Sequence, residues 1–225
     1  MSESLEQYRK DMEYKRRVNS QALAILGRAK SAEIPQKYTR IGPGRFEEIL
    51  CEKFHGDTKK FTEAVYHNAN SLFKKQFIVI DGGDKWARKE AGCAILFRMI
   101  ACDKTGKYVD GNRLSSRLES NRFEKGENRN DIVKELQKEE VLFLNEINKK
   151  DFNVHFEAGK YFDQILERRD DYNRPTILTF SSPLESSGGF AEGNAFTDDR
   201  CGSYLAFLSH ADLKKSTNVF RIRVK

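Results

Sequence analysis

The sequence lacks the features that mark membrane-spanning, secreted and metal-binding proteins. No stretch approaches the roughly 20 consecutive apolar residues that a transmembrane helix requires, and the N-terminus has no apolar core of a secretory signal. The four cysteines are scattered, with no Cys-x-x-Cys pair and no histidine at ligand spacing. This spacing disfavours zinc and predicts buried thiols in a reducing compartment. We therefore expect a cytoplasmic protein with no membrane partner and no structural metal.

The composition is that of a folded domain with an excess of positive charge. The 225 residues suffice for one α/β core and a short appendage, but not for two full domains. Sixteen phenylalanines and eight tyrosines are too many large apolar groups for a disordered chain. The net charge of +6 permits attraction to phosphates but does not require it.

The N-terminal segment has the pattern of a helix. Residues 3–31 contain no proline and only one glycine, and their apolar residues recur with helical spacing. The helix should end before Ile34-Pro35, because proline disfavours helical geometry in the residue that precedes it. Such a helix is either packed on the domain or an arm that binds a partner, and its distance from the candidate site favours the arm. We therefore divide the chain into an arm with its linker, residues 1–38, and an α/β domain, residues 39–225.

Short apolar runs alternate with helical segments through the rest of the chain. Buried parallel strands are predicted from three continuous apolar runs, at 77–81, 141–148 and 175–182. A weaker strand is predicted at 107–109 and a last strand at 218–224. Helices are predicted between them, at 46–73 (two helices), 89–101, 114–123, 131–140, 156–172 and 200–213. This alternation predicts a three-layer α/β fold with a mostly parallel sheet and helices on both faces.

Glycine and polar residues follow the three buried strands. The first strand leads into Gly82-Gly83, the second ends in Asn145-Glu146, and the third ends near Ser181. In an open parallel sheet, ligands bind beyond these strand ends. The helix that follows the glycines would offer backbone N–H groups and the positive end of its dipole to a phosphate. The pattern predicts a nucleotide site of P-loop type at this edge.

The glycine turn departs from a working P-loop, GxxxxGK[ST], whose second glycine admits phosphate, whose lysine neutralises it and whose hydroxyl binds Mg²⁺. This chain reads GGDKWARK, so Ala87 replaces the second glycine, Arg88 the lysine and Lys89 the hydroxyl residue. Asp84 adds negative charge, and Trp86 is large for a tight loop. We expect ATP or ADP with Mg²⁺ to bind weakly or not at all.

The second strand carries a parallel change. Hydrolytic sites of this type end that strand in Asp-Glu, where the aspartate holds magnesium. Asn145 has no charge to offer the metal, although Glu146 could still orient a water molecule. Both changes predict lost or impaired hydrolysis. The alternative is an active ATPase with an unorthodox P-loop, in which Lys85, Arg88 or Lys89 takes the place of the usual lysine.

The order of these elements resembles the bacterial DnaC/DnaI helicase loaders, AAA+ proteins related to the transposition ATPase IstB. The most specific stretch is FDQILERRDDYNRPTILTFSS, residues 162–182, where an arginine pair leads through an Arg-Pro-Thr turn into a strand. By this resemblance Ser181 occupies the position of a sensor asparagine, and Arg200 matches an arginine that faces a neighbouring subunit's nucleotide, although Tyr204 lies where a second arginine is expected. A compact, phage-encoded loader would fit this form.

The resemblance implies an AAA+ fold that binds a hexameric replicative helicase through its N-terminal region and single-stranded DNA through its core, with self-association of subunits. Our leading hypothesis is a helicase-loader-like replication protein with lost or impaired ATP hydrolysis. The alternative is an inhibitor that occupies the loader's place on the helicase. Basic residues supply sequence-independent DNA contacts, and the candidates, each equally compatible with a solvated surface, are Lys107, Arg113, Arg117, Arg221 and Arg223.

Overall fold

The computed structural model describes residues 2–39, 77–119, 128–147, 157–181 and 219–224. Its strands are β1 (Phe77–Gly82), β2 (Gly106–Asp110), β3 (Val141–Ile147), β4 (Thr176–Phe180) and β5 (Val219–Val224). Its helices are α1 (Ser2–Ser31), α2 (Gln36–Thr39), α6 (Lys85–Ala101), α7 (Gly111–Glu119), α8 (Arg129–Lys138) and α9 (Glu157–Asp171). The helices predicted at 46–73 and 200–213 lie outside the described residues, as do Arg200 and Tyr204.

The strands form one parallel sheet in the order β2-β3-β4-β1-β5. Strands β2, β3 and β4 are neighbours in chain order, whereas β1 lies apart from β2 and β5 lies apart from β4. Because all the pairings are parallel, each connection crosses over a face of the sheet. Strand β1 pairs with β4 on one side and β5 on the other, and Ile78 and Val79 are both fully buried. The predicted parallel α/β architecture is confirmed.

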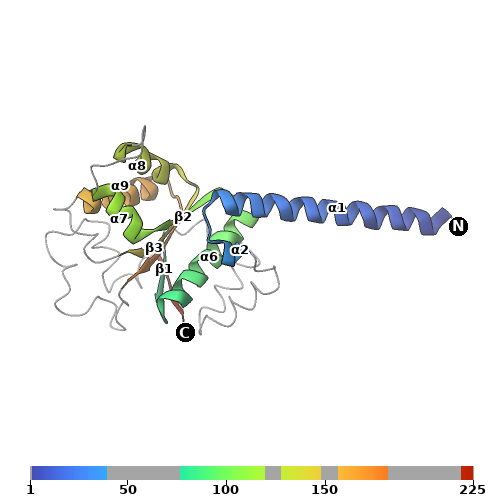
Figure 1. The fold of residues 1–225 in the computed structure, drawn as a ribbon, viewed down its shortest axis with the longest axis horizontal. Coiled ribbons are helices and arrows are strands. Elements are labelled where there is room, and N and C mark those ends of the chain that lie inside the picture. The colour runs from blue at the N-terminus through green and yellow to red at the C-terminus, as the bar shows by residue number, and fades with distance from the viewer. Residues whose placement is uncertain (1, 40–76, 120–127, 148–156, 182–218, 225) are drawn as a thin grey trace.

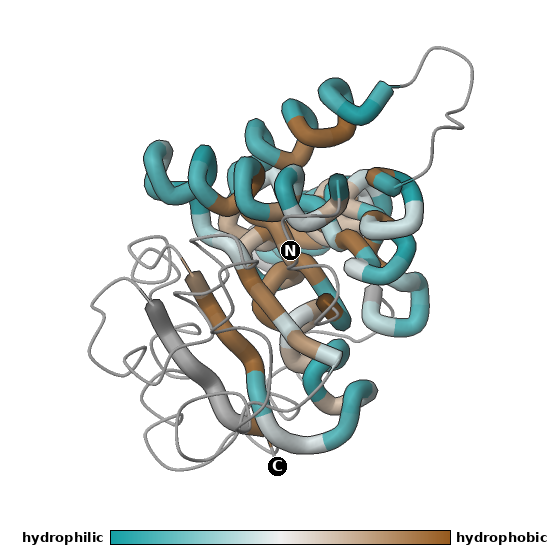
Figure 2. The backbone as a smooth tube through the Cα atoms, turned by 90° about the vertical axis from the view of Figure 1, so that its left-hand side faces the viewer, coloured by the Kyte–Doolittle hydropathy of each residue, from teal (hydrophilic) through white to brown (hydrophobic). Residues whose placement is uncertain are grey.

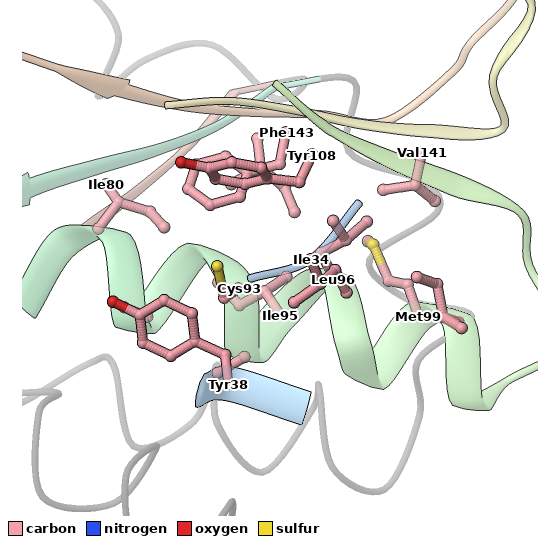
Figure 3. Close-up of a cluster of buried hydrophobic side chains, with 14 of the residues drawn as sticks. Ile34, Tyr38, Ile80, Cys93, Ile95, Leu96, Met99, Tyr108, Val141 and Phe143 are labelled. Carbon is pink, nitrogen blue, oxygen red and sulfur yellow. The ribbon is translucent and has the colours of Figure 1, made fainter. Parts of the chain in front are cut away.

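Helices cover both faces of the sheet (Figure 1). Successive strand residues point to opposite faces, so Ile78 joins the core beneath α6, whereas Val79 joins the core beneath α7, α8 and α9. Figure 3 shows the first of these cores, where Tyr38 of α2 and Cys93 of α6 lie beside Tyr108 of β2. The hydrophobic residues gather on the strands and the inner sides of the helices (Figure 2).

Helix α1 extends away from the domain and touches it only near its C-terminal end (Figure 1). Ala29 and Ala32 are buried against α6, whereas Tyr14 and Leu23 are 61% and 69% exposed. The backbone N–H of Tyr108 donates to Ala32 O at 2.7 Å, so the end of this segment is joined to edge strand β2. The helix has the form of an arm, and its binding role stays a prediction. Among the described helices, none combines the length and apolar character needed to cross a membrane.

Candidate functional site

The C-terminal ends of β1, β4 and β3 lie side by side in the sheet. The Thr179 hydroxyl connects two of them, because its Oγ1 accepts from Glu146 N at 2.7 Å and donates to Asn145 Oδ1 at 3.1 Å. The N–H of Ser181, just beyond β4, donates to Ile147 O at 2.9 Å. The structure thus brings the polar residues of β3 and β4 together at the edge where the sequence placed a nucleotide site.

A short turn joins β1 to α6 at this edge. Only Gly83 and Asp84 separate the strand from the helix, and Gly82 and Gly83 have φ of 76° and 51°, a region that glycine enters without steric cost. The carboxylate of Asp84 caps the helix by accepting from Ala87 N at 2.7 Å. The helix therefore starts at Lys85, not at residue 89 as the sequence pattern predicted. The Asp84 carboxylate thus accepts a hydrogen bond from a backbone N–H group at the start of the helix, where a P-loop presents such groups to phosphate.

Arg88 fills the inside of this turn. It is 4% exposed, and its Nη1 donates to Gly82 O at 3.1 Å and to Gly83 O at 2.9 Å. Its Nη2 lies 3.5 Å from Glu146 Oε1, forming an ion pair across the strand ends. The guanidinium therefore faces carbonyl oxygens and a carboxylate, which are acceptors, where a P-loop lysine would face phosphate oxygens.

Glu146 is held in an unusual backbone conformation beside Arg88. Its φ is 58°, in the left-handed region that non-glycine residues rarely adopt. The hydrogen bond from its N–H to Thr179 and the ion pair of its side chain with Arg88 hold it there. Such strain is typical of functional positions in a fold. Here the carboxylate that the sequence suggested for orienting water is paired with an arginine.

The two positions that would ligate magnesium carry hydrogen-bond donors. Asn145 Oδ1 is engaged by Thr179, which leaves its amide group, and Lys89 Nζ lies 5.1 Å from the centroid of the Tyr108 ring. Mg²⁺ prefers carboxylate, hydroxyl and water oxygens. In the part of the chain that the structure describes, no three histidine, cysteine or acidic side chains are grouped to hold a metal. These residues do not fit a magnesium–triphosphate group.

Trp86, which the sequence pattern marked only as too large for a loop, lies in the first turn of α6 and is 55% exposed. Lys37 Nζ of α2 lies 4.7 Å from its ring centroid and Lys85 Nζ lies 5.2 Å from it. Lys85 therefore lies against Trp86, outside the turn that Arg88 fills. The sequence carried one signal of this cluster. Three cations, Lys85, Arg88 and Lys89, lie in the first turns of α6, where the positive end of the helix dipole disfavours them.

The candidate DNA contacts separate into two groups. Arg113 and Arg117 are exposed on α7, which begins at the C-terminal end of β2 and so lies at the same edge as the turn. A Cβ on Gly111 would lie 2.9 Å from Asn145 O, so the start of α7 presses directly on the end of β3. Arg113 lies in the first turn of α7, at this end of the strands, whereas Arg117 lies in its last turn.

The other candidates lie elsewhere. Lys107 is at the opposite end of β2, where its ammonium pairs with Glu135 and lies 3.1 Å from Glu33 Oε1. Burial opposes its charge, but the hydrogen bonds to the two carboxylates outweigh burial and raise its pKa. Its charge is already neutralised within the molecule. Arg221 and Arg223 lie on edge strand β5, in register with Val79 and Asp81 of β1.

Comparison with known proteins shows a likeness in structure alone. No protein-family model and no curated protein sequence matches the chain. The replication initiator DnaA, in a structure bound to AMPPCP and single-stranded DNA, is 12% identical with a TM-score of 0.55, over 83% of this chain and 52% of that one. DnaI is 12% identical with a TM-score of 0.53, over 76% of this chain and 83% of that one. The chain spans about half the length of the DnaA structure. It shares the α/β P-loop NTPase fold of these two structures.

Proposed function

We propose that this protein is a helicase-loader-like DNA replication protein that binds a hexameric replicative helicase and single-stranded DNA, with lost or impaired ATP hydrolysis. The observation that carries the proposal is an AAA+-type fold in which Arg88 fills the turn where phosphate would lie. The fold supports the replication role, since DnaI and a DnaA bound to single-stranded DNA share it.

The energetics of the turn support impaired use of nucleotide. A triphosphate could enter only after Arg88 left the two carbonyl oxygens and Glu146. Hydrogen bonds to a charged group contribute about 1.5–3 kcal/mol each, so losing two of them weakens binding by roughly a hundredfold or more. Asp84 would add repulsion, because its carboxylate lies at the first turn of α6. Together these terms argue against turnover by an unorthodox P-loop.

Two surfaces suit the proposed partners. Arg113 and Arg117 are exposed cationic side chains on α7, the helix that begins at the same end of the sheet as the candidate site, and a contact to a nucleic-acid backbone requires such charge. Helix α1 offers exposed Val18, Leu23 and Leu26 along a free-standing stretch, which suits insertion of an arm into a partner. An inhibitor of the helicase or its loader would need only α1, so DNA binding separates the two functions.

Single-stranded DNA binding tests the proposal directly. The double variant Arg113→Glu/Arg117→Glu should weaken binding of a labelled oligonucleotide at least tenfold and reduce the dependence of affinity on salt concentration. Replacement of Lys134, an exposed residue of α8, by glutamate is the matched control and should change affinity far less. A pull-down with replicative helicase, with and without residues 2–20 of α1, tests the second partner. Helicase capture without any DNA binding would favour the inhibitor instead.

A further inference from the structure

We propose that Trp86, flanked by Lys37 and Lys85, is a stacking platform for one base of a single-stranded nucleic acid. This inference rests on the proposed binding of single-stranded DNA and assigns part of that binding to the closed P-loop turn. The platform combines an exposed indole with two ammonium groups from different elements, α2 and α6. Proteins that hold single strands without reading their sequence use this combination of aromatic faces and positive charge.

The exposure of Trp86 is the first observation. Its neighbours Ala87 and Arg88 are buried, yet the indole itself is 55% exposed and is the single tryptophan of the chain. A large aromatic side chain gains by burial and usually finds it. Here the side chain is instead more than half exposed, with lysine side chains near its ring. A ligand with a flat apolar face would supply the missing contact.

The charge around the indole is the second observation. Lys85 and Lys89 lie in the first turns of α6, where the helix dipole disfavours cations, and no acid follows in the first turn. The nearest acid in the turn, Asp84, is engaged by Ala87 N. Arg88 has an internal role, but the placement of Lys85 opposes stability of the free protein. An anionic partner reverses that balance, and a phosphodiester backbone supplies negative charge beside every base.

The contacts that a base would displace are weaker than the contact it would make. An exposed cation–π pair is among the weaker aromatic interactions, whereas stacking of a base on an aromatic side chain is stronger. A base that covers the indole would therefore displace a lysine ammonium from the ring. The released ammonium of Lys37 or Lys85 would then reach the adjacent phosphate. The platform would therefore bind both the base and the phosphate of one nucleotide.

The chain contains a matched control for this arrangement. Tyr172, beyond the end of α9, is 52% exposed and also has two cations near its ring, Arg168 at 4.6 Å and Arg174 at 5.3 Å. Because Tyr172 precedes β4, it lies near the N-terminal ends of the parallel strands, whereas Trp86 lies near their C-terminal ends. Arg168 also lies 3.7 Å from Asp171, which pairs with its charge. Tyr172 should therefore not contribute to binding.

Because Trp86 is the only tryptophan, its intrinsic fluorescence reports on the platform alone. Unlabelled oligothymidylate added to the full chain should quench that fluorescence, with the same dissociation constant that a labelled oligonucleotide gives by anisotropy. In the anisotropy assay, Trp86→Ala should weaken binding about tenfold and Trp86→Phe much less. Lys37→Ala/Lys85→Ala should also reduce the slope of log affinity against log salt by about 0.7 for each lost phosphate contact. Tyr172→Ala should match the unaltered protein.

The outcomes separate the platform from the proposed function. Unchanged affinity in Trp86→Ala, or an equal loss in Tyr172→Ala, overturns the platform while DNA binding stands. No binding of oligothymidylate by the unaltered chain overturns both. A fluorescence change that follows protein concentration without oligonucleotide overturns the platform in favour of contact between copies of the chain. The thermal midpoint of Trp86→Ala should equal that of the unaltered protein, as expected for an exposed side chain, so that a loss of binding is not a loss of fold.

Discussion

At the scale of the residue, Arg88 stabilises the turn between β1 and α6. The guanidinium donates to the carbonyl oxygens of Gly82, at the end of β1, and Gly83, in the turn, and it pairs with the carboxylate of Glu146. Sequence alone identified Arg88 as the substitute for the P-loop lysine but suggested contact with phosphate. The inward direction depends on the positive φ of Gly82 and Gly83, which sets where their carbonyl groups point and has no periodic signal in a sequence.

Replacing Arg88 should therefore destabilise the protein. Arg88→Ala leaves Glu146 and the carbonyl groups of Gly82 and Gly83 without their donor, so we expect a loss of about 2–4 kcal/mol in the free energy of unfolding. Glu146→Gln keeps an acceptor for Arg88 and should cost about 1 kcal/mol. Urea denaturation of both single variants and the double variant gives their coupling energy. Strictly additive losses would show that the pair does not interact.

At the scale of the element, Arg169 joins three segments that the sequence could not place together. It is fully buried, and it donates to Leu136 O at 2.8 Å, Glu139 O at 2.7 Å and Pro175 O at 2.6 Å. Burial lowers its pKa to about 9, and the nearby charge of Arg174 acts in the same direction. The arginine pair of the family resemblance is thus divided between a buried residue, Arg169, and an exposed one, Arg168. Helical periodicity predicted the helix but could not distinguish these roles.

The arginine pair gives a matched test at the same scale. Arg169→Met should lower the free energy of unfolding by about 3 kcal/mol or more, because buried carbonyl groups of α8 and the turn before β4 lose their donor. Arg168→Met removes an exposed side chain and should change it by no more than about 0.5 kcal/mol. Urea midpoints measured side by side decide the matter, and equal effects would contradict the contacts assigned to Arg169.

At the scale of the whole molecule, the sequence predicted the buried strands but not the contacts that Arg88 makes at the candidate site. Continuous apolar runs located β1, β3 and β4 to within about two residues, since strands buried on both faces need apolar side chains throughout. Helix α6 begins four residues earlier than the predicted 89, because Asp84 caps it. The cap is a local contact between Asp84 and Ala87, whereas the position of Arg88 also depends on Glu146, which is distant along the chain. The α/β fold is therefore kept while Arg88 fills the turn between β1 and α6.

This internal occupation predicts a stability that does not respond to nucleotide. A ligand that binds only the folded state at a hundred times its dissociation constant raises the free energy of unfolding by about 2.7 kcal/mol, which shifts the thermal midpoint by several degrees. Millimolar ATP or ADP with Mg²⁺ should leave the midpoint of this protein unchanged, because Arg88 and Asp84 already satisfy the turn. Calorimetric scans over a nucleotide series measure this, with Arg88→Ala scanned in parallel. A midpoint that rises with nucleotide concentration in the unaltered chain would mean that the turn opens and that Arg88 is a gate, not a permanent substitute.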